Sequence, residues 1–199
     1  GRTVEESLLK AARSLEIGVN HLYMKKFESF SDDDMLSYIK DGTDDRIYAI
    51  AELLRRKTDI GMICNATKID MLFLEKIKNI VRTENRLKEH IGDTDTLYTA
   101  KKLGFSDEFI GRLWGMTGEE IYKIREKHGM FPVYKMIDTC ASEFESSIPY
   151  FYSTYEDENE SVVSDKKKII VLGSGPIRIG QGVEFDYSTV HAVTTIKSS

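Results

Sequence analysis

A glycine-rich segment close to the end of the chain holds the residues whose spacing most suggests chemistry. Its glycines follow an apolar run and are Gly173, Gly175, Gly180 and Gly182. Glycines at a turn between a strand and a helix permit positive φ and let backbone N–H groups approach the phosphates of a nucleotide. The dinucleotide fingerprint G-x-G-x-x-G would need a third glycine where this sequence has Arg178. The spacing therefore favours a tight turn over an NAD or FAD site, and a small nucleotide-binding protein using the loop Gly173–Gly182 is the alternative.

Patterns typical of metal sites and nucleophiles are weak elsewhere in the chain. The four histidines are His21, His90, His128 and His191, and none has a second histidine three or four residues away. The two cysteines, Cys64 and Cys140, match no zinc spacing and form no disulfide framework, which suits a reducing compartment. We therefore predict no metal site, no bound cofactor and no catalytic residue within this sequence.

Composition and charge exclude several classes of protein. Of the 199 residues, 41% are hydrophobic and 31% are charged, so the composition is that of neither a disordered nor a membrane-spanning chain. The net charge is −5 and no basic cluster is longer than Lys166–Lys168, which argues against a nucleic-acid surface. The lack of a signal peptide and of a long apolar run predicts a cytoplasmic protein. The sequence has no initiating Met and stops within a predicted helix, so we expect a piece of a longer polypeptide.

These residues must be positioned by a chain whose first two thirds are predicted to be helical. All three prolines lie in the last third, and proline breaks helices. Capping boxes at Thr3-x-x-Glu6 and Thr117-x-x-Glu120 mark two helix starts. Three predicted helix ends carry glycines suited to left-handed caps: Gly104, Gly115 and Gly129. The predicted helices begin at Thr3, Ser31 and Thr43 and then span roughly 68–89, 94–103, 106–114 and 117–128.

Apolar residues at helical spacing predict the core of this region. Ile47, Ile50, Ala51 and Leu54 recur at i, i+3, i+4 and i+7 and form one stripe. The long helix over 68–89 is expected to turn six apolar residues inward: Ile69, Leu72, Phe73, Ile77, Ile80 and Val81. A chain of this length can bury such a set as a core without disulfides.

The chain changes character after Gly129. Two β-rich segments over 133–138 and 150–155 are predicted to be extended, and the polar stretch 156–168 is predicted to be a linker. Lys168–Leu172 has the continuous apolar run of a buried parallel strand, and a helix is expected from about Asp186. The predicted fold class is mainly α, a helical domain followed by a truncated β-loop-α unit of a Rossmann-like domain. One strand cannot build the crevice in which nucleotides bind.

The residues around the glycine loop resemble a known family. The run K-I-I-V-L-G-S-G-P-I-R-I-G-Q-G-V-E-F-D-Y over 168–187 is similar to the start of the second synthetase half of the carbamoyl phosphate synthetase large subunit. Upstream, P-V-Y-K over 132–135, D-T-C-A-S-E-F over 138–144 and Y-S-T-Y-E over 152–156 resemble the stretch that precedes that half. G-R-T-V-E-E-S-L-L-K-A over 1–11 and R-I-Y-A-I over 46–50 resemble still earlier parts. The resemblance covers essentially the whole chain in order.

The resemblance implies a helical oligomerization domain between two synthetase halves. Residues 1–17 would be the tail of the first, carboxyphosphate half, 18–164 the oligomerization domain, and 165–199 the start of the second, carbamoyl phosphate half, a pre-ATP-grasp domain. The parent enzyme would be an ATP-dependent ligase that makes carbamoyl phosphate from bicarbonate, ammonia from glutamine and two ATP, using Mg²⁺ or Mn²⁺ and K⁺. It would serve arginine or pyrimidine biosynthesis. Its ATP-grasp lobes would lie outside this sequence, so we expect the isolated chain to be inactive.

The resemblance also implies partners and two site residues. The expected partners are a second copy, bound through the helical domain, and a glutaminase small subunit, with no nucleic acid and no membrane. Arg178 and Glu184 match family positions near the second active site, around the end of the tunnel that delivers carbamate. A guanidinium there can hold a carboxylate-like anion by paired hydrogen bonds, and a carboxylate can orient that arginine. A local surface ion pair is the alternative.

Overall fold

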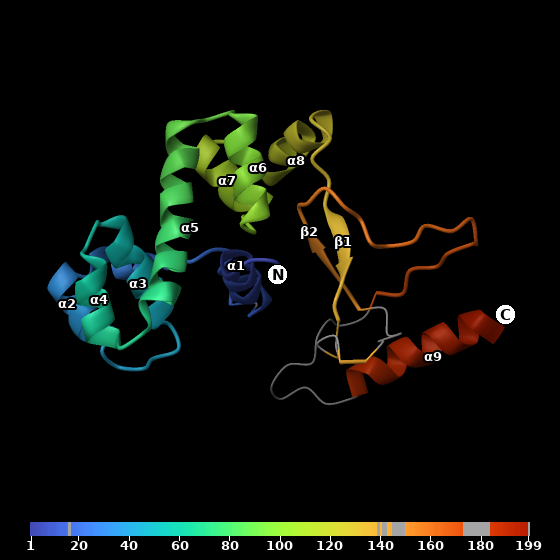
Figure 1. Cartoon of the computed structure of the whole chain (residues 1–199), viewed down its shortest axis with the longest axis horizontal. Helices are drawn as coiled ribbons and strands as arrows, with labels where there is room; N and C mark the ends of the chain where they lie inside the picture. The colour runs from blue at the N-terminus through green and yellow to red at the C-terminus, as the bar shows by residue number, and fades with distance from the viewer. Residues whose placement is uncertain (16, 139, 141–142, 145–149, 173–183, 199) are drawn as a thin grey trace. The chain divides into compact units, whose positions relative to one another are not determined.

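The chain forms two compact units, residues 1–161 and residues 162–199, which are described separately (Figure 1). The computed structural model describes all residues except 16, 139, 141–142, 145–149, 173–183 and 199. The side chains of residues 184–186 are also outside the description. Within the described residues the fold is mainly helical, which confirms the predicted class.

The first unit is a set of helices packed around one long helix. That helix, α5 (Met71–Glu89), contacts α1, α3, α4, α6 and α7, and Figure 1 shows it between the α2–α4 group and the α6–α8 group. The other helical elements are α1 (Val4–Ser14), a 3₁₀ turn (Lys25–Ser29), α2 (Asp32–Tyr38), α3 (Arg46–Arg55), α4 (Ile60–Thr67), α6 (Thr94–Lys102), α7 (Asp107–Trp114) and α8 (Gly118–Lys127). The sequence did not predict α4 or the 3₁₀ turn.

Side-chain caps explain where most of these helices begin. Thr117 Oγ1 accepts from Glu120 N at 3.2 Å and Glu120 Oε2 accepts from Thr117 N at 2.7 Å, which confirms that capping box. At the first helix, Thr3 Oγ1 accepts from Glu6 N, but Glu6 bonds to Arg2 N instead of closing the box. The predicted start at Thr43 is wrong, because α3 begins at Arg46.

The core of the first unit lies between α5 and the helices around it. Ile50, Ala51 and Leu54 of the predicted stripe are buried, as are Ile77, Ile80 and Val81. The prediction for the start of the long helix is wrong, because the side chains of Leu72 and Phe73 are 58% and 50% exposed while Leu74 is fully buried. The predicted start at 68 was also too early: Lys68 ends α4 with a left-handed φ of 59°, and Asp70 caps α5 by accepting from Leu72 N.

Gly104, Gly115 and Gly129 have φ values of 88°, 70° and 68°, which confirms the predicted left-handed helix ends. Gly104 carries a second constraint, because a Cβ at this position would lie 2.9 Å from the Cα atom of Glu6. The end of α6 can therefore approach α1 closely only with glycine at this position.

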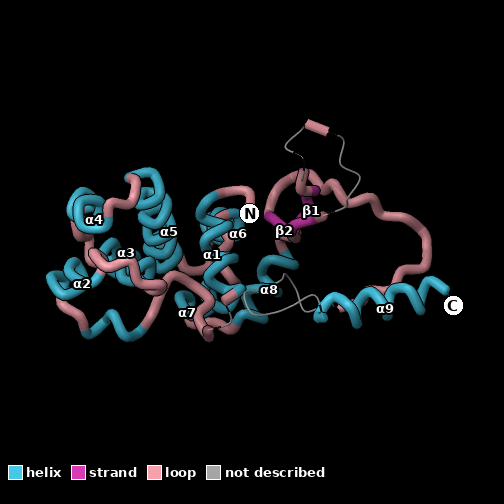
Figure 2. Tube along the Cα trace, turned by 90° about the horizontal axis from the view of Figure 1, so that it is seen from below, coloured by secondary structure: helices cyan, strands magenta, loops and turns pink. Residues whose placement is uncertain are grey.

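A two-stranded hairpin follows the helices and is fastened to them. Strands β1 (Val133–Met136) and β2 (Phe151–Thr154) pair antiparallel, the magenta segments of Figure 2, and Val133 lies opposite Thr154. The hydroxyl of Thr154 donates to Glu6 Oε2 at 3.3 Å. The predicted linker starts as part of this hairpin, because Glu160 N donates to Tyr134 O at 2.8 Å.

The second unit contains α9 (Glu184–Ser198), which confirms the helix predicted from about Asp186. The predicted strand over 168–172 is not formed, and Ile170 and Leu172 are 85% and 90% exposed. A strand needs a neighbour to satisfy its backbone hydrogen bonds, and the described residues offer this apolar run none. Among the described helices, none is both long and apolar enough to span a bilayer.

The different exposures of Leu72 and Leu74 on α5 predict that replacing each by alanine lowers the free energy of unfolding by different amounts. Leu74→Ala should lower the free energy of unfolding by about 2–5 kcal/mol, because it leaves a cavity in the core. Leu72→Ala should change it by less than about 0.5 kcal/mol, because that side chain faces solvent. Urea unfolding at one dilute protein concentration measures both. Equal losses would show that the first turn of α5 is packed after all.

Candidate functional site

The site residues predicted from the sequence lie mostly outside the part of the chain that the structure describes. Arg178 and the loop glycines Gly173, Gly175, Gly180 and Gly182 are outside the described residues. Glu184 is the first residue of α9, and its side chain is also outside them. The tunnel role of Arg178 and Glu184 stays a prediction, and the features that can be built from geometry lie in the first unit.

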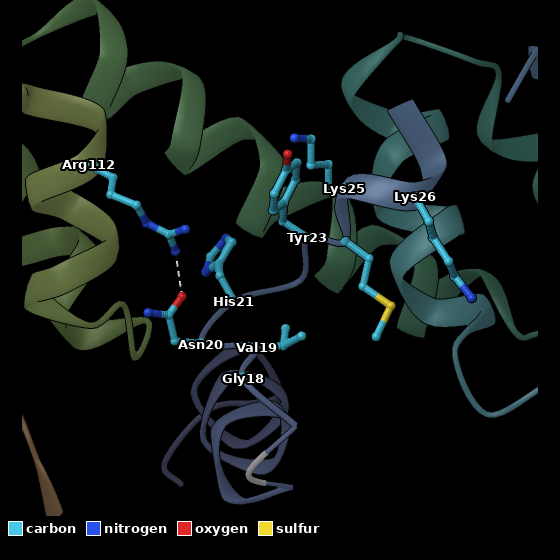
Figure 3. Close-up of a pocket in the computed structure, with 9 residues that line it drawn as sticks. Gly18, Val19, Asn20, His21, Tyr23, Lys25, Lys26 and Arg112 are labelled. Carbon is cyan, nitrogen blue, oxygen red and sulfur yellow. Dashed lines mark hydrogen bonds between the residues drawn. The ribbon is translucent and has the colours of Figure 1, made fainter. Parts of the chain in front are cut away.

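A pocket of about 400 Å³ lies beside the segment that links α1 to the 3₁₀ turn (Figure 3). Its cationic lining residues are Lys25, Lys26 and Arg112. Two of the three are engaged: Arg112 donates to Asn20 Oδ1, and Lys26 points away from them and pairs with Asp45. Asn20 is neutral, so Arg112 keeps its charge beside Lys25, but two cations without a buried set of convergent donors do not identify an anion site.

A buried ion network, which includes the pocket residue His21, joins three parts of the chain. Glu84 on α5 accepts from Arg55 on α3 through both carboxylate oxygens, at 2.8 and 2.7 Å. His21 Nε2 lies 2.8 Å from the same carboxylate. Arg55 also donates to the backbone oxygen of Leu22 at 2.6 Å. Since the Glu84 carboxylate is almost completely buried, Arg55 must supply its counter-charge, and Arg55 and His21 supply its hydrogen bonds.

The protonation states in this network follow from burial and hydrogen bonding. Burial alone would raise the pKa of Glu84, but hydrogen bonds from Arg55 and His21 lower it to about 2. Burial lowers the pKa of His21, against the opposing effect of Glu84. His21 is therefore neutral at pH 7 and donates through Nε2, because an ionised carboxylate can only accept. Its Nδ1 atom is buried and has no hydrogen-bond partner among the described residues. Its ring stacks on Phe109 at 3.6 Å between centroids.

A second ion network holds α6, α7 and α8 together. Asp107 accepts from Lys101 at 2.8 Å and from Arg125 through both carboxylate oxygens, the shortest contact being 2.6 Å. Lys101 and Arg125 are buried, and both lie over the ring of Tyr155, just after β2. The network therefore stabilises the helices and anchors the hairpin.

An apolar groove of about 330 Å³ opens between α1, α3 and α5. Ile50 and Ile77 are its buried residues, and Phe73 stands half exposed on its wall. The remaining lining residues are Leu8, Thr43, Asp44, Arg46, Ile47 and Ile69. We call this the α5 groove. It has the chemistry to receive an apolar side chain from another molecule.

Sequence reasoning missed the residues that organise these sites. Glu84 lies on the same helical stripe as Ile77, Ile80 and Leu87, and a charged residue in such a stripe is the signal that could have identified a buried ion pair. His21 had no comparable signal, because its partner is 63 residues away. No group of three or more His, Cys, Asp or Glu converges in a way that could hold a metal ion, as far as the described residues go.

The buried network predicts a large cost for losing its carboxylate. Glu84→Gln should destabilise the fold by about 3–5 kcal/mol, because it removes the carboxylate that binds Arg55 through both oxygens and leaves this largely buried guanidinium only the 3.3 Å pair with Glu52. Glu119→Gln is the control, because Glu119 is 75% exposed in its pair with Lys123 and should cost less than about 1 kcal/mol. Urea unfolding at pH 7.5 would decide, and comparable losses would contradict the assigned role.

The pKa of His21 predicts a pH dependence of stability. Since this pKa is lower in the folded state than the value of about 6.5 in the unfolded chain, stability is retained above that pH and lost as the pH falls below it. Glu84 adds a further loss only below about pH 4.5. When the pH is lowered from 7.5 to 5.5, the His21→Gln variant should lose less unfolding free energy than the unmodified protein. The His90→Gln variant, changed at an exposed site, should lose as much as the unmodified protein. Identical slopes in all three proteins would refute this origin.

Comparison with known families places these features in context. Residues 1–129 match the family described as the carbamoyl-phosphate synthetase large chain, oligomerisation domain. Residues 165–199 match the carbamoyl phosphate synthase preATP-grasp domain. The first match covers more than half of the chain, contains both ion networks and the α5 groove, and precedes the second in the order that the resemblance predicted. The chain therefore belongs to the carbamoyl-phosphate synthetase large chain family.

Proposed function

We propose that the first unit is an assembly module, which holds copies of a carbamoyl-phosphate synthetase large chain together and links its two synthetase halves. The observation that carries this proposal is that residues 1–129, which match the oligomerisation domain, fall within the helical first unit. The central helix of this unit, α5, leaves apolar side chains exposed to solvent. Exposed apolar clusters on a folded protein mark interaction surfaces.

The parent enzyme in this proposal is a ligase that makes carbamoyl phosphate from bicarbonate, glutamine-derived ammonia and two ATP in the cytoplasm. A glutaminase small subunit would supply the ammonia. The parent enzyme would use ATP, Mg²⁺ or Mn²⁺ and K⁺ as cofactors, and it would serve arginine or pyrimidine biosynthesis. The ATP-grasp lobes of the parent would bind the nucleotide and the metal ions. Residues 1–199 would be inactive alone, because they lack those lobes.

Arg178 and Glu184 keep a role in this proposal as residues near the second active site. Arg178 would hold a carboxylate-like anion by paired hydrogen bonds, and Glu184 would orient the guanidinium or line the polar wall of the tunnel. The support for this role is the preATP-grasp match over 165–199, which contains both residues.

Self-association of the helical unit tests the proposal. Light scattering over a range of concentrations should give at least a dimer for the full 199 residues, and the same stoichiometry for a chain shortened to residues 1–161. A monomer in both cases would overturn the assignment. Association lost only on shortening would assign it to the exposed apolar run at 169–172 instead of the helices.

A further inference from the structure

We propose that the α5 groove is the docking surface for a second copy of this chain, with Phe73 of each copy entering the groove of the other. This inference rests on the proposed assembly function and specifies the face that performs it.

The first turn of α5 has the form of an interface anchor. Met71, Leu72 and Phe73 are consecutive apolar residues with exposures of 40%, 58% and 50%, although they begin the helix on which the unit is built. Phe73 borders the α5 groove, and Leu8, Ile47 and Ile69 supply further apolar lining. An aromatic side chain next to an apolar recess is the arrangement found at the energetic centre of protein interfaces.

This turn is held in place before any partner binds. Asp70 Oδ1 accepts from Leu72 N at 2.8 Å and so fixes the start of the helix. Leu74 and Ile77, one and four residues after Phe73, are buried in the core. Because the helix is already ordered, docking Phe73 would require ordering of its side chain alone, which reduces the entropy lost on binding.

The charges on the groove favour a second copy as the occupant. Asp44 and Arg46 carry opposite charges on the same lining, and neither has an ion pair within the described part of the chain. Around a two-fold axis, Arg46 of one copy can face Asp44 of the other, and the reverse pair forms at the same time. A surface with both signs in this arrangement is complementary to itself. The match to an oligomerisation domain over these residues points to the same occupant.

The experiment compares two phenylalanines of equal exposure. Phe73→Glu should raise the dissociation constant for self-association of the full chain at least about tenfold. Phe131→Glu is the matched control, because Phe131 is 51% exposed and does not line the groove, and its dissociation constant should stay that of the unmodified chain. Sedimentation over a concentration series gives the constants, and circular dichroism with urea unfolding establishes that both variants are folded.

The outcomes separate this inference from the function on which it rests. If the unmodified chain stays monomeric, the assembly function fails, and this docking surface fails with it. If the unmodified chain associates and a folded Phe73→Glu variant associates equally well, the groove is not the interface, whereas the assembly function stands. Equal weakening by Phe73→Glu and Phe131→Glu would also reject the groove, because the effect would then follow added charge instead of position.

A charge exchange tests the two-fold arrangement. Arg46→Glu should weaken association, because it places two acidic residues opposite each other. The double variant Asp44→Lys with Arg46→Glu should restore it, because the opposite charges then face each other again. Glutamate is favoured in the first turn of a helix, where Arg46 lies, so the substitution should not disturb folding. A folded double variant that stays as weak as Arg46→Glu would overturn the arrangement.

Discussion

The carboxylate of Glu84 is the constraint on which the first unit depends. It lies almost fully buried on α5, the helix that contacts α1, α3, α4, α6 and α7, and it is satisfied by Arg55 of α3 and by His21. Removing a buried ion from water is costly unless each of its hydrogen-bonding positions is filled. The position of α3 on α5 and the path of the chain through His21 are therefore fixed together, because a shift of Arg55 would separate the carboxylate from its bidentate cation and a shift of His21 would remove one of its hydrogen bonds.

The same solution recurs at the other end of the unit. Asp107 binds Lys101 and Arg125, and both of these cations also lie over Tyr155, so one carboxylate ties α6, α7 and α8 to the residue that follows β2. Glu6 adds a second attachment by accepting from Thr154. These contacts hold the hairpin on the helices, and the hairpin lies between the residues matched to the oligomerisation domain and those matched to the preATP-grasp domain. The connection between the two matched segments is thus held by buried ions.

The charged and apolar side chains of α5 differ in whether they find a partner within the unit. Its buried charge is fully paired inside the unit, whereas Leu72 and Phe73 at its first turn remain in solvent. The internal pairing gives the unit a rigid framework that does not require a partner. The exposed apolar turn, next to the α5 groove, provides surface that is better buried against another molecule. A rigid unit with an unsatisfied apolar face is well suited to assembly.

Local features of this protein follow from its sequence, and long-range ones do not. The capping box of Thr117 and the left-handed Gly104 were predictable, because each depends on residues within a few positions along the chain. The core stripe of α3 was predictable for the same reason. The exposure of Phe73 and the pairing of Glu84 with His21 were not, because helical spacing shows which residues share a face but not which faces find a partner. Only tertiary packing decides whether a given apolar face is covered, because burial is a property of the surrounding structure and not of the residue.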